Sequence, residues 1–229
     1  MEFTKLSNRL DLVASFVPAG ARLLDVGSDH AYLPIALLQE GKIEAAIAGE
    51  VVEGPYQSAL QNVADNGLED KIEVRLANGL AAFEPEDGIS CITIAGMGGR
   101  LIADILAAGL EKLASVSRLV LQPNNREDEL RAWLVNHDFR IVDEAILEEN
   151  EKFYEILVVE HGSQELTAKE LRFGPYLMRE QAPAFVQKWS KEVEKLAFAL
   201  EQVPVENQSA RASLEERIAH IKEVLHVSK

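Results

Sequence analysis

The sequence has one cysteine, no long apolar run and too few basic side chains to balance its acidic ones. Cys91 is the only cysteine among 229 residues, which excludes an internal disulfide framework and a cysteine-based zinc site, and we expect no metal site. No run of about 18 apolar residues is present, so no membrane-spanning helix is predicted. The N-terminus is amphipathic, carries acids and lacks the apolar segment of a signal peptide. We therefore expect a cytoplasmic protein.

The charge is strongly acidic and unevenly distributed. The chain has 23 Lys and Arg against 38 Asp and Glu, a net charge of −15, which excludes a general affinity of the whole surface for nucleic acid. Residues 1–160 hold 13 basic and 28 acidic side chains, whereas residues 161–229 hold ten of each. The hydrophobic pattern changes at the same place. We therefore predict two units, 1–160 and 161–229.

The first unit alternates short apolar runs with helical patterns. This alternation predicts an α/β fold in which five βα units form a parallel sheet with helices on both faces. The last two runs, 139–147 and 153–159, have only a short acidic turn between them, so they are predicted to form an antiparallel hairpin at one edge. The five strands of the parallel part are expected at residues 22–26, 45–48, 72–76, 91–95 and 119–122.

The second unit has no strand-like run. Residues 185–200 and 214–225 each carry a single apolar stripe at helical spacing, and Val203-Pro204 separates them. This pattern predicts two antiparallel helices in a coiled-coil-like hairpin. The stripe either packs within the protein or binds a partner, and its narrow width favours packing.

Polar residues follow the first two strands where a parallel sheet binds its ligands. Gly27 ends the first strand and lets the backbone pass close to a ligand, and the next helix offers free N–H groups. Glu50 ends the second strand, where a carboxylate can accept hydrogen bonds from both ribose hydroxyls of a nucleoside cofactor. Asp29 would repel a pyrophosphate, which disfavours dinucleotides. S-adenosylmethionine, which has no phosphate and carries two cationic groups, is compatible with these acids.

The third and fourth strands end in further candidates. Asn78, before Gly79, could bond the exocyclic amine of adenine, or the pair could simply form a turn. The run Ala95-Gly96-Met97-Gly98-Gly99 places three glycines within four residues. It indicates close approach of the backbone, either to a ligand or to a packed helix.

These segments resemble a known family. The runs LSNRLDLVASFVP, LLDVGSDHAYLPI, AIAGEVVEGPYQSA, ITIAGMGGRLIADIL and LVLQPN look like the bacterial tRNA adenine-N1 methyltransferases that modify adenosine 22, the TrmK family. The resemblance covers residues 1–160 in order. It implies a Rossmann-like class I methyltransferase sheet followed by a C-terminal helical hairpin, S-adenosylmethionine as donor and tRNA as partner. The absence of an N-P-P-[YF] motif after the fourth strand fits a ring-nitrogen target.

The resemblance also implies roles for individual residues. Asp29, in the GSDHAYLP motif, is the predicted catalytic residue, although it could also cap the following helix. The predicted cofactor contacts are Asp25, Gly27, Ser28, Glu50, Val51, Asn78, Gly79, Ala95, Gly96 and Met97.

Substrate contacts are expected around the same edge and on one helix. His30 could meet a phosphate or cap a turn, Tyr32 could stack on the target base or pack on its helix, and Gln122 and Asn124 could line the base pocket or form a turn. The expected phosphate contacts are Arg100, Arg126 and a stripe of Lys188, Lys191 and Lys195, which could equally be a solvated helix face.

Two other functions remain open at this point. One is a Rossmann-like methyltransferase that acts on a small molecule or a protein, which the acidic charge favours. The other is a non-catalytic cofactor-binding module that docks a partner through its helical hairpin. One sequence does not determine the oligomeric state.

Overall fold

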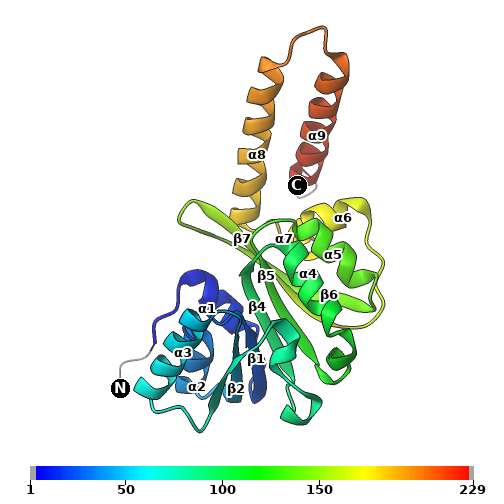
Figure 1. Ribbon diagram of the computed structural model, residues 1–229. Coiled ribbons are helices and arrows are strands. Elements are labelled where there is room, and N and C mark those ends of the chain that lie inside the picture. The colour runs from blue at the N-terminus through cyan, green and yellow to red at the C-terminus, as the bar shows by residue number, and fades with distance from the viewer. Residues whose placement is uncertain (1–3, 227–229) are drawn as a thin grey trace.

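The computed structural model describes residues 4–226 as one mixed sheet with helices on both faces and a helical hairpin that projects from one end (Figure 1). The strand order is β3-β2-β1-β4-β5-β7-β6. Strands β1 to β5 pair in parallel, and β7 runs antiparallel to both β5 and β6, which confirms the predicted parallel sheet with its edge hairpin. The strands are β1 (Ala21–Val26), β2 (Ile43–Glu50), β3 (Ile72–Leu76), β4 (Cys91–Met97), β5 (Arg118–Pro123), β6 (Phe139–Glu149) and β7 (Lys152–His161).

The strand registers bring the predicted ligand-binding residues to one edge. Val26 pairs with Gly49 of β2 and with Ile94 of β4, and Ile94 pairs with Leu121 of β5. The residues that follow these positions therefore lie side by side at the carboxyl ends of the parallel strands, where sheets of this kind bind ligands.

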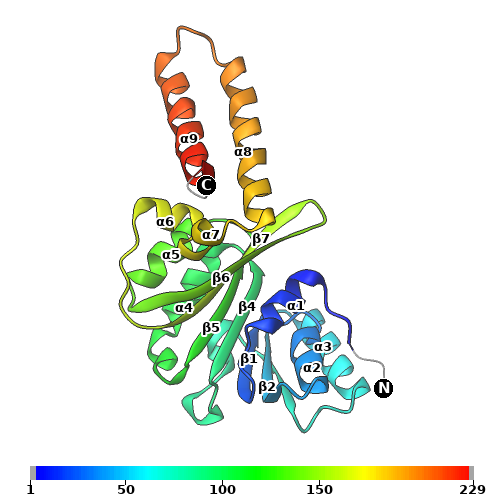
Figure 2. The same cartoon turned by 180° about the vertical axis from the view of Figure 1, so that it is seen from behind.

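Two apolar layers hold the helices to the sheet. One face packs against α1, α2 and α3, and the other against α4 and α5, as Figures 1 and 2 show. The alternation of side chains along each strand makes this two-sided burial possible: Leu24 belongs to one layer and Leu23 to the other. The helices are α1 (Asn8–Ser15), α2 (Tyr32–Gln39), α3 (Glu53–Asp65), α4 (Gly99–Ala108), α5 (Glu127–Val135), α6 (Ala168–Phe173), α7 (Pro175–Glu180), α8 (Pro183–Gln202) and α9 (Gln208–His226).

The prediction of five βα units is wrong in one place. Two 3-10 turns, Gly79–Ala82 and Pro85–Asp87, follow β3 in place of an α-helix. Gly79 has a positive φ of 55° and Pro85 begins the second turn, so neither segment continues as an α-helix. Within residues 4–226, no helix has the length and apolarity needed to cross a membrane.

The helical hairpin packs at the side of the sheet that β6 and β7 form. Helices α8 and α9 lie antiparallel and extend away from it (Figures 1 and 2), as the two stripes predict. The side chains of Leu196 and Ile221 are buried between them. At the base of the hairpin, Phe185 and Trp189 of α8 pack with Phe173 of α6 and with Ile146 of β6, so α6 and α7 connect the hairpin to the sheet.

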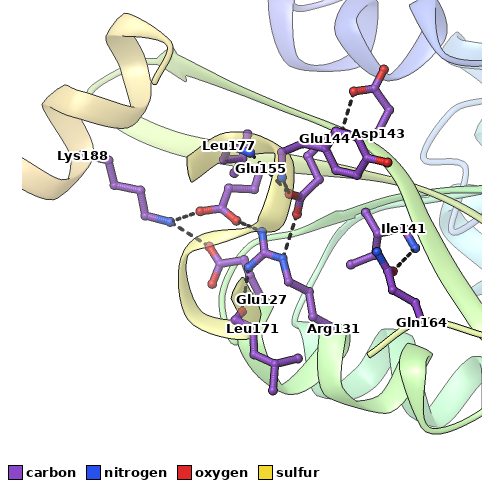
Figure 3. A network of polar contacts seen from close by, with 11 residues as sticks. Glu127, Arg131, Ile141, Asp143, Glu144, Glu155, Gln164, Leu171, Leu177 and Lys188 are labelled. Carbon is purple, nitrogen blue, oxygen red and sulfur yellow. Dashed lines mark hydrogen bonds and ion pairs between the residues drawn. The ribbon is translucent and has the colours of Figure 1, made fainter. Parts of the chain in front are cut away.

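A buried ionic network fixes this connection (Figure 3). Arg131 of α5 donates from Nε to Glu144 of β6 at 2.8 Å and from Nη2 to Glu155 of β7 at 2.5 Å. Lys188 of α8 donates to the other Glu155 oxygen at 2.6 Å and to Glu127 at 3.2 Å. The side chains of Arg131 and Glu144 are fully buried. A charged network thus joins the first helix of the hairpin to the sheet.

The electrostatics of the network depend on every partner. Burial by itself raises the pKa of Glu155, but the cations of Arg131 and Lys188 bring that pKa below its ordinary value. The pKa of Glu144 lies above its ordinary value, because the effect of burial exceeds the lowering by Arg131 and by the backbone N–H of Tyr176.

The turn between α6 and α7 also packs against this network. A Cβ atom on Gly174 would lie within 2.9 Å of side-chain atoms of Glu144 and Arg131, so only glycine fits at this turn.

Candidate functional site

The first part of the site is a buried carboxylate under the end of β1. Asp25 is 4% exposed and accepts hydrogen bonds from Ser28 Oγ and Thr93 Oγ1, both at 2.6 Å. Burial raises the pKa of Asp25, whereas these two hydrogen bonds lower it. Asp25 and Ser28 are therefore engaged with each other beneath the loop, and they shape it from below.

The loop above Asp25 has an unusual backbone. Asp29, His30 and Ala31 have φ angles of 40°, 70° and 58°, three successive residues in the left-handed region without a glycine among them. Such a conformation costs an L-residue about 1–2 kcal/mol and is typical of functional sites. Ala31, not Asp29, is the N-cap of α2, and no side chain caps that helix. Capping by Asp29 or His30 is thereby excluded, and the side chain of Asp29 stays 80% exposed at the edge.

Glu50 holds the loop in place from the neighbouring strand. One of its carboxyl oxygens accepts a hydrogen bond of 2.5 Å from the backbone N–H of Asp29, and the residue is 6% exposed. Burial raises the pKa of Glu50, and the nearby charges of Asp25 and Asp29 raise it further. Three carboxylates thus gather at this point, a setting that favours a cationic ligand over a phosphate.

Next to Glu50 the edge is open and partly apolar. Val51 is 59% exposed directly after β2, and Asn78 is exposed after β3. Gly79 combines a positive φ with tight packing, since a Cβ there would lie 2.9 Å from Ile105 Cγ2 of α4. The turn interpretation of Asn78-Gly79 is correct for the backbone, and it leaves the Asn78 side chain at the surface of the site.

In the glycine run after β4, one glycine packs tightly, as one of the two interpretations predicts, and another is exposed at the edge. Gly99 is a packing residue, because a Cβ there would lie 2.5 Å from the backbone oxygen of Arg126. Gly96 is exposed and has a φ of 79°. Met97 reaches across to β1, where its Cε would be 2.3 Å from a Cβ on Gly27. The Met97 side chain therefore packs against the Gly27 backbone and takes the space that a larger residue at the end of β1 would need.

Behind the glycine run, one amide organises the end of β5. Gln122 is fully buried, and its Oε1 accepts from Arg9 Nη1 at 2.6 Å and from the backbone N–H of Gly96 at 3.0 Å. Its amide group donates to the backbone oxygen of Pro123 and to Asn124, which itself donates to the backbone oxygen of Gly96 at 2.7 Å. Gln122 is therefore a positioning residue rather than an exposed lining of the pocket, whereas Asn124 is exposed.

Arg9 was not predicted as a site residue. It reaches from α1 to Gln122 and stands 5.6 Å above the Tyr154 ring of β7. The only signal for it in the sequence is a basic residue on the polar face of the N-terminal helix, within the segment LSNRLDLVASFVP. Its place beside Gly96 depends on tertiary contacts that spacing along the chain does not reveal.

The remaining candidates line the same edge. His30 lies 3.4 Å from an Asp29 carboxyl oxygen, and its ring faces that of Tyr32 at a centroid distance of 5.4 Å. Tyr32 is 43% exposed, so it does not pack into its helix. Arg100 and Arg126 both lie beside Glu129 near the start of α5.

The predicted lysine stripe is divided. Lys188 is held by Glu155 and Glu127 in the buried network, so it is not part of an exposed basic face. Burial lowers the pKa of Lys188, but its two ion pairs outweigh burial and raise that pKa above its ordinary value. Lys191 and Lys195 remain at the surface, with side chains 50% and 80% exposed. Helical spacing alone could not separate them, because the buried acids that bind Lys188 come from α5 and β7.

The arrangement suits a nucleoside ligand with a cationic group. The Gly27 backbone, the Glu50 carboxylate and the exposed side chain of Val51 follow β1 and β2, and the exposed carboxylate of Asp29 lies beside them. The loop 27–31 has no Lys or Arg that would neutralise a pyrophosphate. These features fit S-adenosylmethionine, as the sequence predicts.

Comparison with known proteins agrees with this geometry. The family model "tRNA (adenine(22)-N(1))-methyltransferase", TrmK, matches residues 23–223. The tRNA (adenine(22)-N(1))-methyltransferase of Bacillus subtilis strain 168 is 39% identical over 98% of this chain and 99% of its own length. A crystal structure of Streptococcus pneumoniae Sp1610 is 66% identical, with a TM-score of 0.95 over 97% of this chain and all of that one. A second structure of Sp1610, in complex with S-adenosyl-L-methionine, has 65% identity and a TM-score of 0.90 over the same shares of the two chains.

Proposed function

The chain belongs to the tRNA (adenine(22)-N(1))-methyltransferase family, and on this premise we propose that it methylates N1 of adenosine 22 in tRNA with S-adenosylmethionine as donor. The observation that carries the proposal is the cluster of Asp25, Asp29 and Glu50 around Gly27, in a chain similar to Sp1610 bound to that donor. The methyltransferase unit is residues 1–160, and residues 161–229 assist in binding the substrate.

The cofactor would lie along the ends of β1 to β4. Gly27 and Met97 would contact its methionine part, Glu50 would accept from the ribose hydroxyls, and Val51 would contact the adenine. Asn78 meets the adenine amine, and Gly79 keeps the chain close to α4. Asp25 and Ser28 support the loop from beneath, and Ala95 and Gly96 border the methyl group.

The residues need to do little acid–base chemistry. Bound S-adenosylmethionine supplies an electrophilic methyl group on a cationic sulfur. Adenine N1 carries a lone pair, so the protein has no proton to remove before attack, and its main task is to align the base. The base gains the positive charge that the sulfur loses, and Asp29 stabilises it with a carboxylate that is already in place. Gln122 keeps Asn124 and Gly96 at the side of the base.

The RNA would approach over the carboxyl edge of the sheet. His30, Tyr32, Asn124, Arg100 and Arg126 lie around that edge. Lys191 and Lys195 extend the contact onto α8. Since the chain is acidic overall, affinity must come from a few basic contacts and from the shape of the tRNA. Adenosine 22 must be exposed before it can enter the site.

The function is tested by mapping the methyl group. Purified protein with labelled S-adenosylmethionine and an unmodified tRNA transcript should give N1-methyladenosine at position 22, located by mass spectrometry of nuclease fragments. The same transcript with guanosine at position 22 should accept no label there. Transfer to a protein extract or to small molecules, but not to this tRNA, would favour the alternative methyltransferase. Cofactor binding without turnover on any RNA would favour a non-catalytic module.

Glu50 gives a separate test of the cofactor site. Glu50→Gln should weaken S-adenosylmethionine binding about 10- to 100-fold, because a hydrogen bond to a charged acceptor is worth about 1.5–3 kcal/mol. Burial raises the pKa of Glu50, so its carboxylate takes up a proton at a higher pH than an ordinary glutamate does. As the pH is lowered, the affinity of the wild-type protein for S-adenosylmethionine should therefore begin to fall above the ordinary titration range of glutamate. Isothermal titration calorimetry across pH 5 to 7.5 measures both effects. Equal affinity of the two proteins at pH 7.5 would contradict the role of Glu50.

A further inference from the structure

A groove lies between the helical hairpin and the sheet, outside the proposed cofactor site. It has a volume of about 750 Å³ and runs from Asn124 and Asn125, after β5, past Phe153 and Tyr154 of β7 to α8. Its near end therefore adjoins the edge where the target base would enter. Its far end follows α8, the helix that rises from beside the β6–β7 hairpin in Figure 1.

The lining of the groove is basic on an acidic protein. Five cations and three acids line it, whereas the whole chain carries a net charge of −15. Three of the lysines are paired with acids: Lys188 with Glu127 and Glu155, Lys191 with Glu148, and Lys195 with Glu192. Within residues 4–226, Lys152 and Arg172 have no carboxylate partner and leave the lining basic. This distribution attracts an anion to the groove.

One donor of a residue that lines the groove has no acceptor among the described residues of the protein. Trp189 is 8% exposed, and its indole Nε1 is the one buried side-chain nitrogen or oxygen within residues 4–226 that lacks a hydrogen-bond partner. The ring is held edge-on against Phe173 at a centroid distance of 4.5 Å. A buried N–H without an acceptor costs free energy, so a persistent one indicates a ligand.

A guanidinium stands over the same ring. The Cζ atom of Arg172 is 5.6 Å from the centre of the Trp189 ring and 5.0 Å from that of Phe173. Arg172 is half-buried and has no carboxylate within 4 Å in the part of the chain that the structure describes. Burial and the charge of Arg217 lower the pKa of Arg172, and the charges of Glu192 and Asp128 only partly offset this.

We propose that this groove is a phosphate-binding subsite for the RNA strand next to the target adenosine, in which Arg172 and the Trp189 indole N–H donate to one phosphate. The inference rests on the proposed function for the identity of the ligand. The Arg172 guanidinium over the ring and the indole N–H at the ring edge can donate to different oxygens of one phosphate. Lys152, Lys191 and Lys195 line the same groove and provide further positive charge for the neighbouring backbone.

The test uses two variants of the full chain and an unmodified tRNA transcript. Trp189→Phe keeps the aromatic packing and removes the indole N–H, so tRNA Kd should rise about fivefold with no loss of thermal stability. Arg172→Gln should raise Kd about tenfold and reduce the slope of log affinity against log salt by about 0.7 to 0.9. Both variants should keep wild-type cofactor affinity and kcat at saturating tRNA, because neither Trp189 nor Arg172 is placed against the reacting atoms.

Matched variants elsewhere serve as controls. Trp133→Phe removes the only other tryptophan, and Lys71→Gln removes one exposed charge at the start of β3, so both should bind tRNA like wild type. Wild-type affinity in both Trp189→Phe and Arg172→Gln would overturn the proposal even if adenosine 22 is methylated.

The two proposals fail in different ways. A wild-type protein that does not methylate adenosine 22 would refute the proposed function, whereas weaker tRNA binding by Trp189→Phe and Arg172→Gln would still support the groove. A poly-glutamate peptide serves as a second anionic probe. If the two variants bind this peptide more weakly than wild type does but bind tRNA equally well, the assignment of the groove to RNA is overturned.

Discussion

Asp29→Asn is expected to lower kcat for tRNA methylation about 100-fold while cofactor affinity changes only a few-fold. The amide has nearly the shape of the carboxylate but no charge. The contact between the Asp29 backbone N–H and Glu50 does not depend on the Asp29 side chain, so the Glu50 carboxylate, which we propose binds the ribose, should stay in place. The loss should therefore appear in the chemical step, measured by single-turnover methylation with enzyme and cofactor in excess over tRNA.

The size of this effect depends on the solvent around the carboxylate. The Asp29 side chain is 80% exposed in the protein alone, where water would screen its charge. A unit charge about 4 Å away interacts by about 1 kcal/mol in water and by about 4 kcal/mol in a partly buried site. The docked tRNA must exclude water from the edge for the larger value to apply. A truncated RNA that covers less of the edge should consequently show a smaller ratio between the single-turnover rates of wild type and Asp29→Asn.

The control variant is His30→Gln, on the same strained loop. It leaves the Asp29 carboxylate in place and removes a ring that lies 3.4 Å from it. It should affect KM for tRNA more than kcat. Retention of wild-type kcat within a few-fold in Asp29→Asn would refute electrostatic stabilisation by Asp29. A kcat that depends on pH through one ionisation in wild type, and not in the variant, would instead support a general base.

The sequence allowed prediction of the sheet and its binding edge because both depend on local pattern. Apolar runs such as CITIA, buried on both faces, indicate parallel central strands, and the end of each strand places Gly27 and Glu50 at one edge. The two stripes predicted the helical hairpin for the same reason. Helices α6 and α7 escaped prediction, because each has six residues and Gly174-Pro175 divides them.

Roles that depend on contacts between distant elements could not be predicted. Lys188 has the same helical spacing as Lys191 and Lys195, yet Glu155, 33 positions away, draws it into the interior. Gln122 follows a strand like a pocket residue, but Arg9 and Gly96 occupy its oxygen. In each case a partner from another element decides whether a polar side chain faces the ligand or supports those that do.

Arg131→Met is expected to lower the free energy of unfolding by about 3–5 kcal/mol, because it removes one partner of a buried ionic network. Arg131 is fully buried and is the counter-charge of both Glu144 and Glu155. Methionine fills much of the volume but leaves Glu144 without a cation, while Glu155 retains Lys188. Urea unfolding at pH 7 measures the loss. Arg140→Met, which removes an exposed pairing with Glu160 at 3.4 Å, should cost less than about 1 kcal/mol.

The pH dependence identifies the cause of this loss. Without Arg131 the pKa of Glu144, already raised by burial, should rise further. A carboxyl group whose pKa is higher in the folded than in the unfolded state binds more protons when folded, so stability increases as the pH falls towards its unfolded value of about 4.3. The deficit of Arg131→Met relative to wild type should therefore shrink between pH 7 and pH 5. A deficit that is constant over this range would indicate lost packing instead of a stranded charge.

A second substitution should repair part of the damage and connect the network to function. Glu144→Gln removes the stranded charge and can still accept from the Tyr176 backbone N–H, so Arg131→Met with Glu144→Gln should be more stable than Arg131→Met alone. Because Glu155 and Lys188 join β7 to α8, the repaired protein should retain the orientation of the hairpin, and KM for tRNA should return towards the wild-type value. If stability recovers while KM stays high, Arg131 itself is needed to hold the hairpin over the edge of the sheet, because its Nη1 donates to the Leu171 backbone oxygen at 3.1 Å.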